Sequence, residues 1–367
     1  MSADNNSIQC LSHLAWEPTL FQRPQQLMQR FAARGYRVSY VGCVGVRRKR
    51  DLPESGTNVN LKWTHSGYAP GVSKLAAMRQ RLASLEVRKL SPGPLPIVWL
   101  YHPSLYPLIE KLPRKLLVYD VMDRFDSFDK NGEAAAADEK VLLERADVIF
   151  TGGSSLQTAV EQKLSGISRR GAGPVCFPSG IDYEHFATAA AQGQLPPDLD
   201  KLPRPVFGYF GAIDERIDYE LLSKLAATGG SVALIGPQIG EPAQNLHPNI
   251  HMLGPQAYKD LPSYLRGFDV CLLPFRQTAL VAHISPTKTP EYLAGGKPVV
   301  STMIPDVALM YGDIVNVAKS AEEFVAACVA AAAAPPDAQR HQDAARRGRS
   351  WEQIATEMDA ILQQNPG

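Results

Sequence analysis

Short apolar runs alternate with longer amphipathic stretches along most of the chain. The runs are rich in β-branched residues and apolar on both faces, which is typical of buried parallel strands. The amphipathic stretches repeat apolar residues at helical spacing. The expected strands are residues 7–14, 38–41, 97–101, 116–121, 148–151, 206–210, 232–235, 250–253, 270–274, 299–301 and 314–317. The expected helices are residues 24–34, 218–227, 259–267, 287–295, 320–333 and 351–363.

This alternation predicts the α/β class, with a doubly wound sheet in each half of the chain. A loop rich in Pro, Gln and Asp at 192–204 separates the two series, and we expect the domain boundary there. The helix at 351–363 is amphipathic and no strand follows it, so it must dock on existing structure.

Composition describes an ordinary globular protein, since 45% of the 367 residues are apolar and 20% are charged. No apolar run is long enough to span a bilayer. The first residues lack the basic and apolar regions of a secretory signal. Five scattered cysteines without a CxxC pair predict buried, reduced thiols in a cytoplasmic protein.

Charge is spread unevenly, although the net charge is only +1. Residues 1–115 carry 17 Lys and Arg against 6 Asp and Glu, and the remainder carries 21 against 31. The basic run Arg47–Arg50 and the segment 74–90 account for much of this excess. In that segment, leucines recur at helical spacing among basic residues. It can therefore lie on an anionic membrane, or it can pack its leucines inward. Nucleic acid is not expected, because no aromatic interleaving or reader motif appears.

The segment 283–302 has the residue types of an anion site. Ser285 can cap a helix and Pro286 suits its first turn. The helix start at 286–288, with free N–H groups at Thr287 and Lys288, and the Lys288 charge would attract a diphosphate. Glu291 could accept from ribose hydroxyls. An ordinary capped helix with a surface Lys and Glu explains the same pattern.

Other strand ends offer further candidates in this half. Gly211 permits close approach to a phosphate, and Arg216 could supply charge. Gly236 and Leu253, at the ends of two neighbouring strands, could frame a base. Packed glycines and simple turns are the competing explanation.

In the N-terminal half, Trp16, Gln22 and Arg23 open the first helix and suit a sugar or phosphate, or simple packing. The glycine-rich dinucleotide fingerprint is absent there, which argues against a dehydrogenase. Asp120 and Asp123 begin a run of carboxylates after a strand and could provide a general base. They could also hold a metal or lie in a solvated loop. His102 follows the strand at 97–101 and is a further catalytic candidate, and His13 is similar.

Several of these segments resemble glycosyltransferases of family 4 and the wider group 1 type. The likeness is carried by GYFGAIDERIDYELL (208–222), the run at 249–275, SPTKTPEYLAGGKPVVST (285–302) and FPSGIDYEHF (177–186). WEPTLFQRPQQL is similar to a subgroup of bacterial polysaccharide glycosyltransferases. The resemblance implies the GT-B architecture, with two Rossmann-like, doubly wound domains facing across a cleft. Residues 1–190 would bind acceptor, 200–349 would bind nucleotide-sugar, and 350–367 would cross back onto the first domain.

By the same resemblance, Glu291 matches the second Glu of the family's E-x7-E motif, which contacts the ribose. His283 stands where the first Glu, which lies by the transferred sugar, is usual. Arg216 keeps one of the family's two cations. The usual N-domain His falls near Met122–Asp123, so retaining and inverting courses both stay open. Asp120 or Asp123 would be the base of an inverting course, and the leaving phosphate that of a retaining one.

We therefore expect sugar transfer from a nucleotide-sugar, UDP- rather than GDP-linked, to a glycan or lipid-linked acceptor in bacterial surface or exopolysaccharide synthesis. The expected setting is the cytoplasm or the inner face of its membrane, with no metal and no cofactor. A nucleotide-sugar 2-epimerase and a non-catalytic sugar-nucleotide-binding scaffold are the alternatives.

Overall fold

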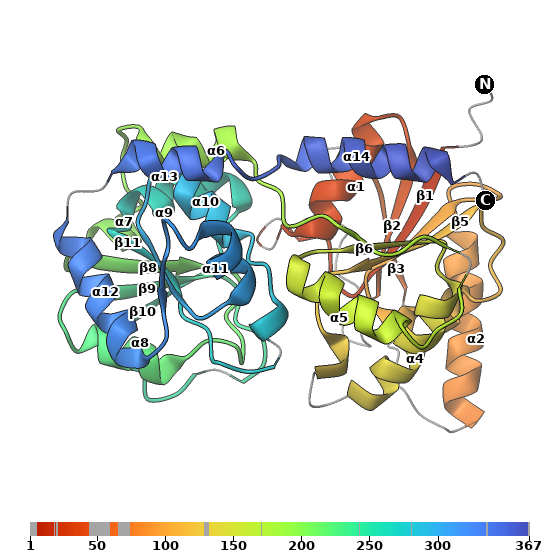
Figure 1. Cartoon of the computed structure of the whole chain (residues 1–367), viewed down its shortest axis with the longest axis horizontal. Helices are drawn as coiled ribbons and strands as arrows, with labels where there is room; N and C mark the ends of the chain where they lie inside the picture. Colours follow the sequence, from red (N-terminus) through yellow and green to blue (C-terminus); the bar gives the residue numbers. More distant parts are fainter. Residues whose placement is uncertain are drawn as a thin grey trace. The chain divides into compact units, whose positions relative to one another are not determined.

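The computed structural model describes residues 6–17, 19, 21–43, 59–64, 74–127, 132–169, 171–241, 243–279, 281–334 and 337–365. Contacts between Cα atoms divide the chain into two compact units. The first unit comprises Met1–Glu17, Gln22–Pro178 and Trp351–Gly367, and the second comprises Pro18–Phe21 and Ser179–Ser350. Each unit is built on its own parallel sheet (Figure 1). The predicted α/β class is confirmed.

The first sheet has the strand order β3-β2-β1-β4-β5-β6-β7. Its strands are β1 (Ser7–Ser12), β2 (Arg37–Cys43), β3 (Val59–Thr64), β4 (Ile97–Leu100), β5 (Leu116–Val121), β6 (Val148–Thr151) and β7 (Val175–Cys176). Ile8 of β1 pairs with Val38 on one side and Ile97 on the other. The chain therefore reverses its direction across the sheet between β1 and β4. The sequence did not predict β3 and β7, because β3 alternates apolar and polar residues and β7 has only two residues.

Helices of the first unit are α1 (Arg23–Ala33), α2 (Lys74–Lys89), α3 (Tyr106–Ile109), α4 (Gly132–Arg145), α5 (Ser154–Leu164) and α14 (Trp351–Gln364), with 3-10 turns η1 (Pro103–Leu105) and η2 (Phe125–Ser127). In α2, Ala83 and Val87 are buried, whereas Leu82 and Leu85 are 56% and 55% exposed. The sequence left open whether the leucines of this helix pack inward, and Leu82 and Leu85 do not.

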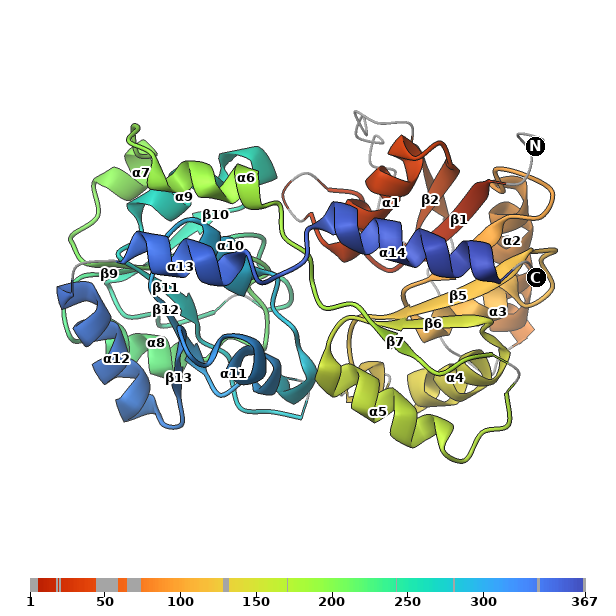
Figure 2. The ribbon, with the colours of Figure 1, turned by 45° about the horizontal axis from the view of Figure 1, so that its top comes forward.

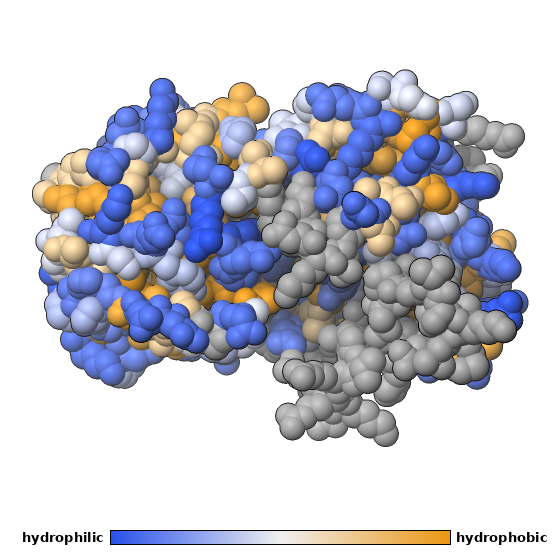
Figure 3. All heavy atoms as spheres, turned by 90° about the horizontal axis from the view of Figure 1, so that it is seen from below, coloured by the Kyte–Doolittle hydropathy of each residue, from blue (hydrophilic) through white to orange (hydrophobic). Residues whose placement is uncertain are grey.

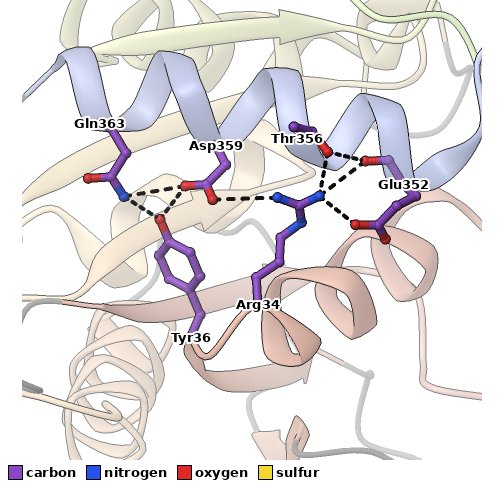
Figure 4. Close-up of polar contacts among 6 residues, drawn as sticks. All are labelled: Arg34, Tyr36, Glu352, Thr356, Asp359 and Gln363. Carbon is purple, nitrogen blue, oxygen red and sulfur yellow. Dashed lines mark hydrogen bonds and ion pairs between the residues drawn. The ribbon is translucent and has the colours of Figure 1, made fainter.

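The C-terminal helix α14 packs on the first unit beside α1 (Figures 1 and 2). Arg34 donates to Glu352 and to the Thr356 hydroxyl on α14 (Figure 4). The Tyr36 hydroxyl donates to Asp359 at 2.6 Å. Beneath these polar contacts lies an apolar face of α14, formed by Trp351, Ile354, Ala355, Met358 and Leu362.

The second sheet has the order β10-β9-β8-β11-β12-β13. Its strands are β8 (Val206–Phe210), β9 (Ser231–Ile235), β10 (Ile250–Gly254), β11 (Val270–Leu273), β12 (Val299–Thr302) and β13 (Asn316–Ala318). Its helices are α6 (Tyr183–Ala187), α7 (Pro197–Asp200), α8 (Tyr219–Ala226), α9 (Leu261–Gly267), α10 (Lys288–Ala294), α11 (Pro305–Tyr311), α12 (Ala321–Ala333) and α13 (Ala338–Ala345), with 3-10 turns η3 (Thr188–Ala190), η4 (Tyr258–Asp260) and η5 (Val281–His283). This sheet reverses between β8 and β11.

The units divide between Pro178 and Ser179, not in the loop at 192–204 where the sequence places the boundary. Phe186 of α6 is fully buried in the core of the second unit, and Leu199 of α7 joins it there. The Pro-rich segment therefore lies inside the second unit, because its few apolar residues anchor it to that core.

Candidate active site

Three neighbouring strands of the second sheet end in glycines with positive φ, at +145° for Gly211, +147° for Gly236 and +75° for Gly254. The Gly236 N–H donates to the Gly254 carbonyl at 2.9 Å. A Cβ on Gly236 would lie 1.8 Å from the Gly211 carbonyl oxygen. Only glycine fits this packing. The carboxyl ends of these three strands are thus bare backbone, at the edge where open α/β sheets bind ligands.

Lys288, the first residue of α10, crosses this edge. A Cβ on Gly211 would lie 2.5 Å from Lys288 Cε and 3.1 Å from Nζ. The lysine stem therefore occupies the space that a side chain at Gly211 would need. Gly211 follows β8, beside the reversal between β8 and β11, so the ammonium group lies at the switch point of the sheet.

The helix that carries Lys288 begins later than the sequence predicts. Its N-cap is Thr287, whose side chain makes no capping hydrogen bond. The predicted capping role of Ser285 and first-turn position of Pro286 are therefore wrong. The Ser285 carbonyl instead accepts from the Ser179 hydroxyl at 3.1 Å. Pro290 lies within the first turn, where a missing N–H costs no intrahelical bond.

Glu291 is only 6% exposed, so it is not the surface carboxylate of an ordinary capped helix. Burial raises its pKa to about 8, the Lys288 charge acts in the opposite direction, and Asp182 raises it further. The side chain is therefore largely protonated at neutral pH. It can then both donate to and accept from hydroxyl groups.

The remaining predicted residues of this unit have mixed surroundings. Arg216 forms two hydrogen bonds with Asp214, from Nε to Oδ1 at 2.9 Å and from Nη2 to Oδ2 at 2.6 Å. Its charge is thus balanced locally. Leu253 is half-buried near the end of β10, and His283 ends the short 3-10 turn before the Lys288 segment. The base-framing role of Leu253 and the catalytic role of His283 stay predictions.

In the first unit, the residues expected to bind acceptor have structural partners. The Trp16 ring is 4% exposed and packs edge-on against Tyr40, with ring centroids 5.0 Å apart. Gln22 precedes α1, and its N–H donates to the Gln25 side chain at 3.1 Å. These contacts favour packing over ligand binding for Trp16 and helix capping for Gln22.

Arg23 and Asp120 form a buried ion pair. Arg23 Nε lies 3.0 and 3.1 Å from the two Asp120 oxygens, and Nη2 lies 2.9 Å from Oδ1. Arg23 Nη1 also donates to the Phe177 carbonyl at 2.7 Å. Burial lowers the pKa of Arg23, but the Asp120 carboxylate more than offsets this effect and raises it.

The pair therefore ties α1 and β5 to the segment after β7. Asp120 is fully buried and Arg23 is 3% exposed. A carboxylate so enclosed cannot take a proton from an acceptor, so the prediction of Asp120 as general base is wrong. The predicted acceptor contact of Arg23 is wrong for the same reason.

The carboxylates after β5 differ from one another. Asp126 accepts from Arg124 at 2.8 Å and lies 3.1 Å from Lys163 Nζ. Burial alone would raise the pKa of Asp126, but these two cations lower it to about 2. Asp123 is half-buried and stays the candidate base of this run. Within the ranges that the structure describes, no group of three or more His, Cys, Asp or Glu could hold a metal ion.

His102 lies after β4, and its Nδ1 accepts from the Ser104 N–H at 3.2 Å. The ring proton therefore resides on Nε2. Burial lowers the pKa of His102 to about 4. The side chain is thus a neutral hydrogen-bond donor at Nε2, and this geometry does not support its predicted catalytic role if that role is to act as a base.

Comparison with known families identifies the second unit. Residues 207–333 match the family model "Glycosyl transferases group 1". This part of the chain is a group 1 glycosyltransferase domain. Over 199 residues, 51% of the chain, the sequence is 27% identical to TuaH of Bacillus subtilis (strain 168), named as a proposed teichuronic acid biosynthesis glycosyltransferase. The match covers about half (49%) of the length of that relative.

Solved structures extend the likeness to both units. A sucrose-phosphate synthase from Thermosynechococcus elongatus aligns with a TM-score of 0.74 at 16% identity, covering 98% of this chain and 99% of the other. HepE of Anabaena in complex with UDP-glucose aligns with a TM-score of 0.68 at 15% identity, covering 98% and 99%. Identities this low show the fold alone. The chain therefore has the predicted GT-B fold.

Asp120→Asn should strongly destabilise the first unit, because it leaves the Arg23 charge buried without its counter-ion. The expected loss is about 3–5 kcal/mol in the free energy of unfolding, measured by urea denaturation. Asp313→Asn is the control, since its pair with Arg347 is exposed on both sides. If Asp120→Asn unfolds at the same urea concentration as the wild type, the buried pair contributes nothing to the free energy of unfolding.

Glu291→Gln should alter how stability depends on pH. The pKa of Glu291 is about 8 in the folded chain against an ordinary 4.5, so the folded state holds an extra proton between these values. Stability therefore falls as the pH rises from about 4.5 to about 8. The Tm of Glu291→Gln should rise relative to wild type between pH 5 and pH 8, and that of exposed Glu220→Gln should not. A difference that does not change with pH would contradict the buried, protonated carboxyl.

Proposed function

We propose that this chain transfers a sugar from a UDP-sugar to a hydroxyl group of a glycan or lipid-linked acceptor, in bacterial surface or exopolysaccharide synthesis. The observation that carries the proposal is Lys288 lying across Gly211 with Glu291 buried on the same helix. This arrangement offers a cation, bare backbone and a hydroxyl-binding carboxyl at one strand end. TuaH, named for teichuronic acid biosynthesis, and HepE, solved with UDP-glucose, support the choice of donor and pathway class.

In the proposed reaction, the bond between the anomeric carbon and the diphosphate oxygen breaks while the acceptor oxygen bonds to that carbon. Lys288 stabilises the negative charge that develops on the leaving diphosphate. Glu291 holds the ribose through its hydroxyls. Lys288 supplies the positive charge that a metal ion would otherwise provide, so we propose a metal-independent reaction.

The stereochemical course follows from where the acceptor proton goes. In a retaining course, which we propose, the leaving phosphate takes it. In an inverting course, Asp123 would take it. The backbone at Gly211 and Gly236 and the base-framing position of Leu253 would serve the donor in either course.

One observation favours a second candidate, a scaffold that binds sugar nucleotides without turnover. His283 stands where the resembled family has the carboxylate beside the transferred sugar. A neutral or cationic side chain there would change how the sugar is held. Nucleotide binding without hydrolysis, transfer or epimerisation would indicate this candidate, and a new sugar nucleotide formed without acceptor would indicate a 2-epimerase.

We also propose that α2 rests on an anionic membrane surface. Its exposed face combines Leu82 and Leu85 with exposed Arg81, Arg88 and Lys89. Cations flanking apolar side chains are the composition that binds anionic headgroups. No described helix is long and apolar enough to cross a membrane. The basic run Arg47–Arg50 lies outside the described residues.

The coloured surface of one face of the molecule is mostly hydrophilic, with smaller hydrophobic patches (Figure 3).

Nucleotide binding tests the donor site. UDP at 100 times its Kd should stabilise the wild type by about 2.7 kcal/mol, seen as a rise in Tm, whereas ADP should have little effect. Lys288→Ala should weaken UDP binding at least about tenfold, because a charge-assisted contact is lost. Lys319→Ala, an exposed lysine of the same unit, should bind UDP as the wild type does. If UDP leaves the Tm unchanged, the proposed donor is wrong.

Vesicle flotation tests the membrane surface. The wild type should float with phosphatidylglycerol vesicles and not with neutral phosphatidylcholine vesicles, and salt should release it. Changing Leu82 and Leu85 together to Ser should abolish flotation. Leu309→Ser, which removes a 72% exposed leucine from the second unit, should not. Equal flotation of the double variant and the wild type would remove α2 as the contact.

A further inference from the structure

Two imidazoles lie together at the reversal of strand order in the first sheet. His13 directly follows β1 and His102 follows β4, and these strands are neighbours. Their ring centroids are 5.0 Å apart. Phe125, 4% exposed, packs against both rings, with centroids 4.2 Å from His102 and 5.4 Å from His13. This is the position where open α/β sheets bind ligands, and the donor site does not include it.

Hydrogen bonding fixes how both rings present their nitrogens. In His102, Nδ1 accepts from Ser104, so Nε2 carries the proton. In His13, Nδ1 is buried without a partner. An orphaned lone pair costs less than an orphaned N–H group, so His13 also carries its proton on Nε2. No hydrogen bond within the described residues engages either Nε2, and both residues are half-buried and not enclosed. Two N–H donors are therefore free for a ligand.

Charge indicates the kind of ligand. Burial lowers the pKa of His13 to about 3, with a smaller contribution from His102, and burial lowers that of His102 to about 4. Both rings are neutral at physiological pH. Neutral N–H donors beside an apolar ring suit hydroxyl oxygens better than phosphates, which bind Arg, Lys and helix termini.

We propose that His13 and His102 form a subsite for an uncharged sugar ring of the acceptor, with both Nε2–H groups donating to its hydroxyl oxygens. The subsite rests on the proposed transferase function and specifies its acceptor. Because the available nitrogens carry protons, the two histidines position the acceptor and do not deprotonate it. Phe125 holds both rings in place.

The probes are methyl glucoside, methyl galactoside and methyl N-acetylglucosaminide, added at millimolar concentrations to full-length protein with 15N-labelled histidines. At least one should shift the His13 and His102 Nε2 resonances saturably. The resonances of His251 and His341, in the second unit, should stay unmoved. Inorganic phosphate should not shift the His13 and His102 resonances. If no glycoside shifts them, or if phosphate does so more strongly, the subsite is wrong.

Variants separate hydrogen bonding from packing. His102→Phe keeps an aromatic ring but no donor, and should weaken glycoside binding at least about tenfold. His102→Gln keeps an N–H donor and should bind within about threefold of wild type. His341→Phe is the matched control in the second unit. Equal binding by His102→Phe and wild type would overturn the proposal, and His13→Phe repeats the test should His102→Phe not fold.

UDP binding, measured in parallel by thermal shift, separates this proposal from the transferase function. UDP binding with unmoved histidines overturns only the subsite. Glycoside binding without UDP binding overturns the transferase function and leaves a sugar-binding site.

Discussion

Three glycines at the carboxyl ends of β8, β9 and β10 are the constraint on which the proposed donor site in the second unit depends. Gly236 must be glycine because a Cβ there would lie 1.8 Å from the Gly211 carbonyl oxygen. Gly211 lies beside the Lys288 side chain and has a φ of +145°, a conformation that favours glycine. Glu291 is buried on the same helix and is largely protonated at neutral pH. A lysine beside bare backbone is an arrangement that suits a diphosphate.

In the first unit, several described charged side chains at the carboxyl ends of the strands are paired with counter-ions. Its carboxyl edge carries an internally neutralised pair in Arg23 and Asp120, and Asp126 balanced by neighbouring cations. The two histidines beside them are neutral. These residues are neutral or balanced by counter-ions, and the two histidines keep hydrogen-bonding capacity, which suits hydroxyl-rich molecules. The electrostatics of the two sheets thus divide the proposed substrates, diphosphate on one and sugar on the other.

The sequence predicted those elements whose physical cause is local. Strands buried on both faces, such as β5 and β8, are visible as apolar runs. The edge strand β3 was missed, because half of its residues are polar. Ser285 and Pro286 have the residue types of a helix start, but the bond from Ser179 holds that segment outside the helix. No local pattern shows that contact between residues distant in the sequence.

The roles of individual residues were likewise predictable only where they did not depend on contacts between residues distant in the sequence. Asp120 has the position of a base, and only its contact with Arg23, 97 residues away, reveals a structural carboxylate. Lys288 and Glu291 were identified in part through the resemblance to a known family, whereas the pairing of His13 with His102 needed the strand order. The domain boundary also depended on which core Phe186 joins.

The docking of α14 on the first unit, through Arg34, Tyr36 and the apolar face around Met358, determines when that unit can finish folding. During synthesis, residues 6–178 emerge early but lack one of their packing partners until residues beyond Ser350 are made. The second unit, nearly continuous in sequence, is complete before then. Of the two units, the one that is translated first is therefore the last to be assembled.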